Sequence, residues 1–283
     1  MKAIKAFGRK VFDRLEGHGI NLYRKRDTTR LTPQDRVINL LNRIWPHENG
    51  YELIRIGGPG DGGYLVPDDL AGISECFSPG SNKLSNFESE IAQHWQIKSF
   101  ICDSVDEKPS NLTSLQDFTE GWVGPATDEL MYVSLSDWVK TKSKSDSDLM
   151  LQMDIEGSEY LTLLATPSDL LNRFRIIVIE LHFLEALKNN WAFEKIYLPF
   201  FDKILQVFDV VHVHPNNCCG TWSYGNFEYP RIVELTLHRK DRGNNLHPKV
   251  TSRNVLDYPC VNSKQDFFLV FSESQNRVTV KWE

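Results

Sequence analysis

The stretch LMLQMDIEGSEY, at residues 149–160, decides the fold class. Its first five residues are almost entirely apolar, which is typical of a strand buried on both faces. Gly157 then permits a sharp turn, and the spacing of the following residues predicts a helix over 158–165. A buried strand that passes directly into a helix is the repeating unit of an α/β sheet.

The same alternation of short apolar runs and helical segments continues on both sides of this stretch. Strands are predicted at 73–77, 97–102, 130–133, 149–153, 176–181, 210–213 and 232–237. Helices are predicted at 33–44 behind Thr32 as a cap, at 86–95, 158–165 and 191–207, with a helical turn at 134–140. This pattern favours an α/β fold with a doubly wound, mostly parallel seven-stranded sheet and one late antiparallel strand. Such sheets bind ligands at the carboxyl ends of their strands.

The composition is that of a folded protein with a sizeable core. Of the 283 residues, 41% are hydrophobic and 25% are charged. No apolar stretch approaches the roughly 18 residues of a membrane-spanning helix, and charges interrupt residues 1–15 too often for a secretory signal. The net charge of −6 argues against a dedicated nucleic-acid-binding protein. Five cysteines, an odd number without metal-site spacing, indicate a reducing cytoplasm.

Residues 1–30 carry a charge opposite to that of the rest. Nine basic and three acidic side chains give them +6, so the remainder carries about −12. Apolar residues at helical spacing predict a basic amphipathic helix over 2–16. We expect this helix to dock on the folded domain, to contact a second subunit in a homo-oligomer, or to attach peripherally to an anionic membrane. The chain thus divides into a basic helical N-terminal extension, 1–49, and one α/β domain, 50–283.

Two polar features follow the first two strands of the predicted sheet. The small-residue loop 78–82 leads from strand to helix, where a ligand can approach backbone amides, although a plain turn has the same composition. The second strand ends at Asp103. A carboxylate there can accept hydrogen bonds from both hydroxyls of a ribose, or it can cap a helix. Together the two features favour a cofactor that contains adenosine.

Polar side chains also gather at the ends of the fourth and fifth strands. Asp154 and Glu156 lie two residues apart, and Glu180 and His182 repeat this spacing. If the strands are neighbours, the four groups converge in an arrangement that suits acid–base catalysis or a cation. Alternatively Glu156, and with better reason Glu159, stabilises the positive end of the following helix. Asp154 and Glu180 suit a divalent cation such as Mg²⁺, but two ligands do not make a site, and no residue is assigned to a metal.

Six segments occur in a characteristic order. They are RIGGPGDGGY at 55–64, FSPGS at 77–81, DIEGSEY at 154–160, IIVIELH at 176–182, VHVHPNN at 211–217 and VELT at 233–236. In this order they resemble the FkbM-type family of S-adenosylmethionine-dependent methyltransferases. The resemblance covers roughly residues 50 to 240. It departs from the family at Ser78-Pro79-Gly80, where a more glycine-rich turn is usual.

The resemblance implies a class I methyltransferase fold, which is Rossmann-like. It also implies transfer of a methyl group from S-adenosyl-L-methionine to a hydroxyl of a sugar, a glycan or a small metabolite, without a nucleic-acid partner. For the cofactor, it places Gly80 beside the methionine part and Asp103 at the ribose. Asp61, Tyr64 and Ser78 complete the residues that border the same cleft.

A hydroxyl acceptor requires a base that removes its proton. His182 and His214 titrate in the right range, and Asp154 either orients one of them or accepts the proton itself. His212 points to the same face of its strand as His214 and is expected in the core or behind the site. Two other functions remain open. One is a non-catalytic binding module on the same fold, and the other is a nicotinamide-dependent oxidoreductase, for which a GxGxxG motif is missing.

Overall fold

The computed structural model describes residues 30–81, 83–128, 131–144, 146–244 and 246–283. Its centre is a seven-stranded sheet in the order β11 (Phe208–Pro215), β14 (Val233–Arg239), β10 (Phe174–Leu181), β9 (Asp148–Met153), β4 (Ile73–Pro79), β5 (Lys98–Asp103) and β6 (Gln116–Glu120). Its neighbouring strands pair in parallel except at β14, which runs antiparallel to both β10 and β11. The predicted doubly wound sheet with one late antiparallel strand is confirmed.

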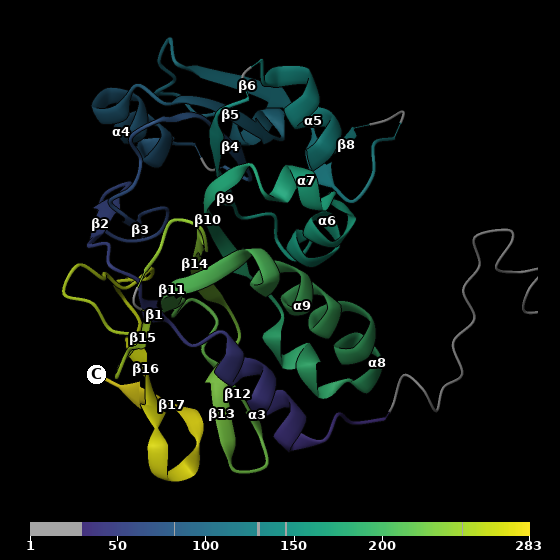
Figure 1. The fold of residues 1–283 in the computed structure, drawn as a ribbon, viewed down its shortest axis with the longest axis vertical. Helices are drawn as coiled ribbons and strands as arrows, with labels where there is room; N and C mark the ends of the chain where they lie inside the picture. Colours follow the sequence, from purple (N-terminus) through teal and green to yellow (C-terminus); the bar gives the residue numbers. More distant parts are fainter. Residues whose placement is uncertain (1–29, 82, 129–130, 145, 245) are drawn as a thin grey trace, which may run out of the picture.

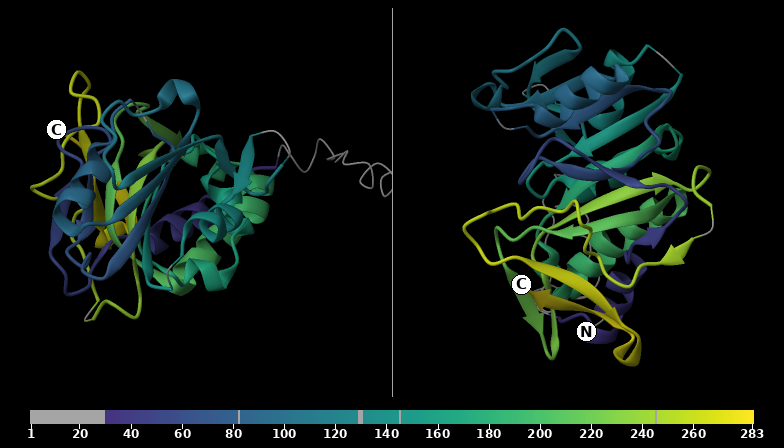
Figure 2. Two further views of the ribbon diagram at one scale, coloured as in Figure 1. Left: turned by 90° about the horizontal axis from the view of Figure 1, so that it is seen from above. Right: turned by 90° about the vertical axis from the view of Figure 1, so that its left-hand side faces the viewer.

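Helices and a hairpin cover the two faces of this sheet (Figure 1). Helix α4 (Asn86–Trp95) and the hairpin of β2 (Leu53–Ile56) and β3 (Tyr64–Pro67) pack on one face, against Met150, Ile176 and Val178. The other face is covered by α3 (Gln34–Arg43), α5 (Leu135–Lys142), α6 (Glu159–Ala165) and α9 (Leu198–Val207). Leu149, Leu151 and Ile177 point to this second face, as the alternation of side chains along a strand requires. Figure 2 shows the sheet between its two covering layers.

Short elements connect and extend these layers. Besides the hairpin of β2 and β3, four further pairs of strands lie outside the sheet in the described residues: β1 (His47–Glu48) with β15 (His247–Pro248), β7 (Trp122–Gly124) with β8 (Tyr132–Ser134), β12 (Thr221–Tyr224) with β13 (Phe227–Pro230), and β16 (Phe267–Ser272) with β17 (Arg277–Trp282). The short helices are η1 (Val105–Glu107), α7 (Ser168–Leu171), η2 (Leu184–Lys188), α8 (Asn190–Ala192), η3 (Phe193–Tyr197) and η4 (Glu273–Gln275). The helix predicted at 191–207 is present, with η3 as a π-helical segment between α8 and α9.

Two details of the predicted fold are wrong. The sequence predicts the third strand of the sheet at 130–133, but β6 holds that position and β8 pairs with β7 instead. Strand β6 reads QDFTE and lies at the sheet edge, where a strand needs few apolar residues. The cap of α3 is not Thr32, because Pro33 holds the N-cap position and the Thr32 hydroxyl donates to the carbonyl of Leu187 (2.8 Å).

Helix α3 is part of the main hydrophobic core. Val37, Leu40 and Leu41 are buried in it, against the same cluster as the second face of the sheet. The amphipathic helix predicted over 2–16 lies outside the described residues, and the domain division at residue 49 stays a prediction. In the described part of the chain, no helix has the length and apolar character needed to cross a membrane.

A buried ion-pair network lies at the end of the sheet where the parallel strands begin. Asp69 accepts two hydrogen bonds from Arg242, each 2.8 Å long, and one from Arg175 at 3.3 Å. His238 Nε2 lies 3.0 Å from the same carboxylate. Arg175 also donates to Asp148 at the first residue of β9 (2.8 Å). This network joins β3, β9, β10 and β14 on the side of the sheet opposite to its carboxyl ends.

Candidate functional site

A cavity of about 520 Å³ opens at the carboxyl ends of β4, β5 and β9. Four of the five residues predicted for the cofactor line it, namely Asp61, Tyr64, Gly80 and Asp103. Ser78 does not reach the cavity. It is fully buried beneath it, where hydrogen bonds link its hydroxyl to Glu88 and Gln152. The structure therefore brings the predicted cofactor residues together from three separate segments and leaves Ser78 in a supporting position.

Gly80 lies directly against the backbone of β9. Its φ of +83° is in the left-handed region, and a Cβ at this position would lie 1.5 Å from the carbonyl oxygen of Asp154. Its amide donates to the carbonyl of Cys102 (3.0 Å), and the amide of Asp154 donates to the carbonyl of Pro79 (3.1 Å). Only glycine fits here, and the contact holds the ends of β4, β5 and β9 together.

Asp103 organises the loop that it faces. One of its carboxylate oxygens accepts from the amide of Ser81 and the other from the amide of Ser104, both at 2.6 Å. A carboxylate has about four acceptor positions, so each oxygen keeps capacity for a further hydrogen bond. Asp103 can thus fix the loop after β4 and still accept hydrogen bonds from a bound ligand.

The glycine-rich segment 57–63 forms another wall. The amide of Gly57 donates to the Glu90 carboxylate in α4 (2.8 Å), and a Cβ on Gly57 would lie 2.3 Å from the carbonyl of Gly62. This tight turn presents Asp61 and Tyr64 to the cavity. The Tyr64 hydroxyl accepts from the Gln152 amide (3.3 Å), which ties the wall to β9.

The predicted convergence of Asp154, Glu156, Glu180 and His182 is present. His182 Nε2 lies 3.8 Å from Asp154, 3.5 Å from Glu156 and 4.0 Å from Glu180. Its Nδ1 lies 3.1 Å from Glu159, which also accepts from the amides of Ile155 and Gly157. Glu159 therefore stabilises the turn before α6, as the helix-terminus interpretation predicts, and it also orients His182.

Burial and mutual repulsion divide the protons unevenly between these carboxyl groups. Burial raises the pKa of Asp154 to about 6, against the opposing charge of His182. Burial together with the charge of Asp154 raises the pKa of Glu180 to about 10. Burial alone would lower the pKa of His182, but its hydrogen bond with Glu159 raises it. At neutral pH Asp154 is thus ionised, and Glu180 keeps its proton and can donate it to Asp154 in a hydrogen bond.

A second polar group lies beside the first, at the ends of β11 and β14. His214 pairs in register with Glu234, which in turn pairs with Glu180 on β10, so three side chains form a row across the strands. His214 Nδ1 lies 3.1 Å from Glu234, and the Cys260 thiol donates to the same carboxylate at 3.1 Å. No role was predicted for Glu234 or Cys260. Glu234 is an acidic residue near the start of an apolar strand predicted at 232–237, which could have indicated it, but Cys260 lies in a long irregular segment.

His212 is a buried supporting residue, as predicted. Only 2% of its surface is exposed, and its Nε2 lies 2.9 Å from Asp257. Burial lowers its pKa, so the ring is neutral at pH 7. His214 borders a cavity of about 430 Å³ that is separate from the cofactor cavity and lies between β11 and residues 252–268. The structure thus places His214 farther from the cofactor residues than Asp154.

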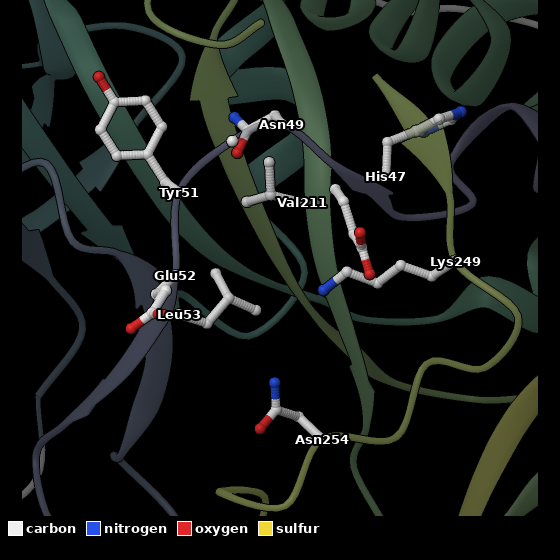
Figure 3. A pocket seen from close by; sticks show the side chains of 10 residues that line it. His47, Asn49, Tyr51, Glu52, Leu53, Val211, Lys249 and Asn254 are labelled. Atoms are coloured by element: carbon white, nitrogen blue, oxygen red, sulfur yellow. The ribbon is translucent and has the colours of Figure 1, made fainter. Parts of the chain in front are cut away.

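A further cavity of about 370 Å³ lies between residues 47–53 and the segment around Lys249. Figure 3 shows the Lys249 side chain extending into this cavity, with Val211 above its end and Asn254 below. Asn254 also borders the cavity next to His214. None of the predicted site residues lines this third cavity, so it does not belong to the candidate active site.

Three groups of side chains have donor atoms close enough to share a metal ion in the described residues. They are Asp154, Glu180 and His182; Asp61, Glu180 and Glu234; and His214, Glu234 and Cys260. The first contains both residues that the sequence analysis considered for a divalent cation. All three lie at the same end of the sheet, where the parallel strands finish and the antiparallel β14 begins.

Comparison with known proteins identifies the family. The profile of the methyltransferase FkbM domain matches residues 80–248, which is more than half of the chain. The chain belongs to the FkbM methyltransferase family. Membership confirms the resemblance drawn from the motifs and, with the strand order, the class I methyltransferase fold. Methyltransferases of this family generally use S-adenosylmethionine, so this cofactor is implied for the chain. No curated protein sequence matches it.

Solved structures with a similar fold share little sequence with this FkbM family member. One is the 30S ribosomal A1408 methyltransferase from an uncultured bacterium, with 11% identity and a TM-score of 0.30, covering 66% of this chain and 100% of that one. Another is the delta-N METTL16 MTase domain, with 12% identity and a TM-score of 0.31, covering 83% of this chain and 94% of that one. Similarity at this level says nothing about the substrate of this chain.

Proposed function

We propose that this protein is an S-adenosylmethionine-dependent O-methyltransferase that acts on a hydroxyl of a sugar, a glycan or another small polar metabolite. Family membership supplies the reaction type. The observation that favours a hydroxyl is Asp154, a carboxylate on the wall of the cofactor cavity with a pKa raised by burial to about 6. A hydroxyl must lose its proton when it is methylated, and a carboxylate of this kind is ionised at neutral pH and available to accept it.

The lining of the cavity fits S-adenosylmethionine. Gly80 lines it without a side chain that could obstruct a ligand, and Asp103 offers carboxylate oxygens to a ribose. An adjoining cavity of about 200 Å³ contains the partly exposed rings of Trp122 and Tyr132, on which a purine can stack. Asp61 adds negative charge, which attracts a cationic ligand. When bound, S-adenosylmethionine supplies a methyl group on a positively charged sulfur that is ready to leave.

The residues around Asp154 support its role as proton acceptor. Glu180 keeps its own proton and hydrogen-bonds Asp154, which stabilises the ionised form. Asn216 donates to Glu180 (2.7 Å) and holds it in place. Glu159 orients His182 and, against the effect of burial, raises its pKa through their hydrogen bond, which favours the positively charged ring behind the carboxylate. The chain's own task is then to align the acceptor oxygen and to remove its proton.

The charge of the cavity favours a neutral acceptor. Asp61, Asp154 and Glu156 line it, and its described lining residues include neither lysine nor arginine. Carboxylates accept hydrogen bonds from sugar hydroxyls, whereas a phosphate or carboxylate on the acceptor would be repelled. We therefore expect a polyhydroxyl compound without negative charge.

The function is tested by incubating the protein with S-adenosylmethionine and a panel of neutral sugars, phosphorylated sugars, amines and thiols. We expect one CH₂ to be added to a neutral polyhydroxyl compound, as mass spectrometry would show. Methylation confined to amines, thiols or phosphorylated compounds would contradict the proposal. Calorimetry with S-adenosylmethionine and S-adenosylhomocysteine distinguishes the enzyme from a non-catalytic binding module on the same fold. Binding of neither compound would favour the binding module.

The rate should depend on pH through Asp154. Because this carboxylate must be ionised to accept a proton, and burial raises its pKa to about 6, kcat should rise with pH and reach half of its plateau near that value. Asp154→Asn should lower kcat by about 10² to 10⁴-fold. Calorimetry of the variant with S-adenosylmethionine provides the control. If Asp154→Asn bound the cofactor normally and kept full activity, or if the wild-type protein were fully active at pH 5, another group would be the base.

Asp103→Ala should weaken binding of S-adenosylmethionine by about 10 to 100-fold, because each hydrogen bond to a charged group contributes about 1.5–3 kcal/mol. Asp106→Ala is the matched control, since Asp106 is an exposed carboxylate three residues away that does not line the cavity. Calorimetry measures both. Equal affinities for the two variants would remove Asp103 from the cofactor site, provided that thermal melting shows both to be folded.

Location and partners beyond the acceptor remain proposals. The five cysteines are unbridged in the structure, which is compatible with the reducing cytoplasm that we propose. Contact of residues 2–16 with a membrane or a second subunit is a proposal about residues outside the described part of the chain. Deletion of residues 2–16, followed by vesicle sedimentation and analytical ultracentrifugation, would distinguish these two roles.

A further inference from the structure

The group formed by His214, Glu234 and Cys260 has the geometry of a metal site. Three different donor types converge: an imidazole nitrogen, a carboxylate and a thiol. The distances are 3.1 Å from His214 Nδ1 to Glu234 Oε2, 3.1 Å from Cys260 Sγ to Glu234 Oε1, and 3.9 Å from Cys260 Sγ to His214 Nδ1. A tetrahedral zinc ion with bonds of about 2.0 Å to N and O and about 2.3 Å to S separates its ligands by roughly 3.3–3.6 Å. The contacts of His214 and Cys260 go to different oxygens of Glu234, and all three distances lie close to this range, so rotation of side chains lets the three groups share one ion.

The three ligands are held in place independently of any metal. Glu234 and His214 are fixed opposite each other by the pairing of β14 with β11. The segment that carries Cys260 is fastened on both sides of it, because Asp257 contacts His212 (2.9 Å) and the amide of Val261 donates to Asn217 (2.8 Å). A site whose ligands are preorganised loses little conformational entropy when it binds an ion.

The charges around the group also favour a divalent cation. A carboxylate oxygen of Asp61 lies within 4.8 Å of an oxygen of Glu234, so two acidic groups face each other, while Glu180 beside them keeps its proton and adds no charge. A Zn²⁺ ion bound by one thiolate, one carboxylate and a neutral imidazole leaves no net charge within the site. The cation thus offsets a repulsion that the protein otherwise bears.

We propose that His214, Glu234 and Cys260 bind Zn²⁺ through Nδ1, a carboxylate oxygen and the thiolate sulfur, with water as the fourth ligand. The thiol proton passes to solvent when the ion binds. His214 binds as a neutral ring with its remaining proton on Nε2, so a proton on Nδ1 of a neutral ring moves to Nε2, and a doubly protonated ring releases its Nδ1 proton to solvent. The thiolate and imidazole select zinc over Mg²⁺, which prefers oxygen ligands in octahedral geometry. The other two groups of side chains have no thiol, and both depend on Glu180. Bound zinc would hold residues 253–264 against the carboxyl end of β11 and the amino end of β14.

Cobalt is a suitable probe of this site, because a thiolate bound to Co²⁺ gives a charge-transfer absorption in the near ultraviolet. The full-length protein, freed of metal by a chelator, is titrated with Co²⁺ and then with Zn²⁺. We expect one Co²⁺ per chain with the charge-transfer band, displacement by Zn²⁺, and no displacement by excess Mg²⁺. Absence of the band from the wild-type protein would overturn the proposal, whatever the methylation assay shows.

Variants locate the site. Cys260→Ser should abolish the band and weaken Zn²⁺ binding by at least about 100-fold. Loss of a residue that only hydrogen-bonds a metal ligand already lowers metal affinity by about 10 to 100-fold. Glu234→Gln should keep the band and weaken binding, and it serves as the second variant if Cys260→Ser fails to fold. Cys219→Ser is the matched control, because Cys219 is exposed and contacts only the neighbouring thiol of Cys218. A band lost in Cys219→Ser and kept in Cys260→Ser would place the metal on the adjacent cysteine pair and contradict the proposal.

Discussion

Gly80→Ala should abolish binding of S-adenosylmethionine and lower the free energy of unfolding by about 3 kcal/mol. A methyl group here would lie 1.5 Å from the carbonyl oxygen of Asp154, and the φ of +83° adds backbone strain. The loop after β4 and the end of β9 would have to separate. Because both line the cofactor cavity, its shape would change at the residue nearest to the proposed base. Calorimetry with the cofactor and urea unfolding measure the two effects.

Gly220→Ala is the matched control for this substitution. Gly220 also has a positive φ, of +67°, but a Cβ there meets no atom within 4 Å, and it does not line the cofactor cavity. We expect this variant to lose only about 1 kcal/mol of unfolding free energy, from the strain of an alanine at positive φ, and to bind S-adenosylmethionine normally. If Gly80→Ala bound the cofactor as tightly as Gly220→Ala, the close contact with Asp154 would not shape the cofactor site.

Asp69→Ala should destabilise the fold by about 3 kcal/mol, because it removes the carboxylate that Arg175, Arg242 and His238 share. Arg175 keeps its hydrogen bond to Asp148, so its charge is still paired. Burial alone would raise the pKa of Asp69, but hydrogen bonds from Arg242 and His238 lower it. This stabilisation is therefore complete above the unfolded pKa of about 3.9 and is lost as the pH falls through the lower folded value. Urea unfolding at several acidic pH values should show a weaker pH dependence in the variant than in the wild type.

Asp68→Ala is the control for this network. Asp68 is the exposed neighbour of Asp69, and its backbone amide, which donates to Glu52, is unaffected by the change. We expect a loss within about 0.5 kcal/mol. Equal stabilities of the two variants would mean that Arg175 and His238 find other partners or water when Asp69 is removed.

Most of the fold could be predicted from the sequence because its central strands are buried on both faces. Strands such as β9 and β10 are almost uniformly apolar, and helices separate them, which leaves few topologies. Strand β6 could not be found in this way. It lies at the edge of the sheet, and its five residues contain one apolar side chain, Phe118. Its sequence therefore lacks the apolar run that identifies the buried strands.

The candidate site could be predicted only where local sequence positions its residues. Asp154 and Glu180 follow apolar strands at fixed spacing, and parallel strands bring such positions together. Ser78 shows the limit of this reasoning, because the direction of a side chain at a strand end depends on partners such as Glu88 and Gln152 from elsewhere in the chain. Cys260 reaches Glu234 through an irregular segment whose path is set by tertiary hydrogen bonds, which no local pattern encodes.

The late insertion of β14 has a consequence for biosynthesis. The residues that line the cofactor cavity all lie between Gly57 and Glu156, and their strands leave the ribosome first. Strands β10 and β11 become neighbours of β14 only after residue 233 has been synthesised, and Cys260 follows later still. A growing chain therefore completes the residues of this cavity well before the group of His214, Glu234 and Cys260. Until β14 enters, β10 and β11 also expose unpaired strand edges, so this stage of synthesis is when the nascent chain most needs protection from aggregation.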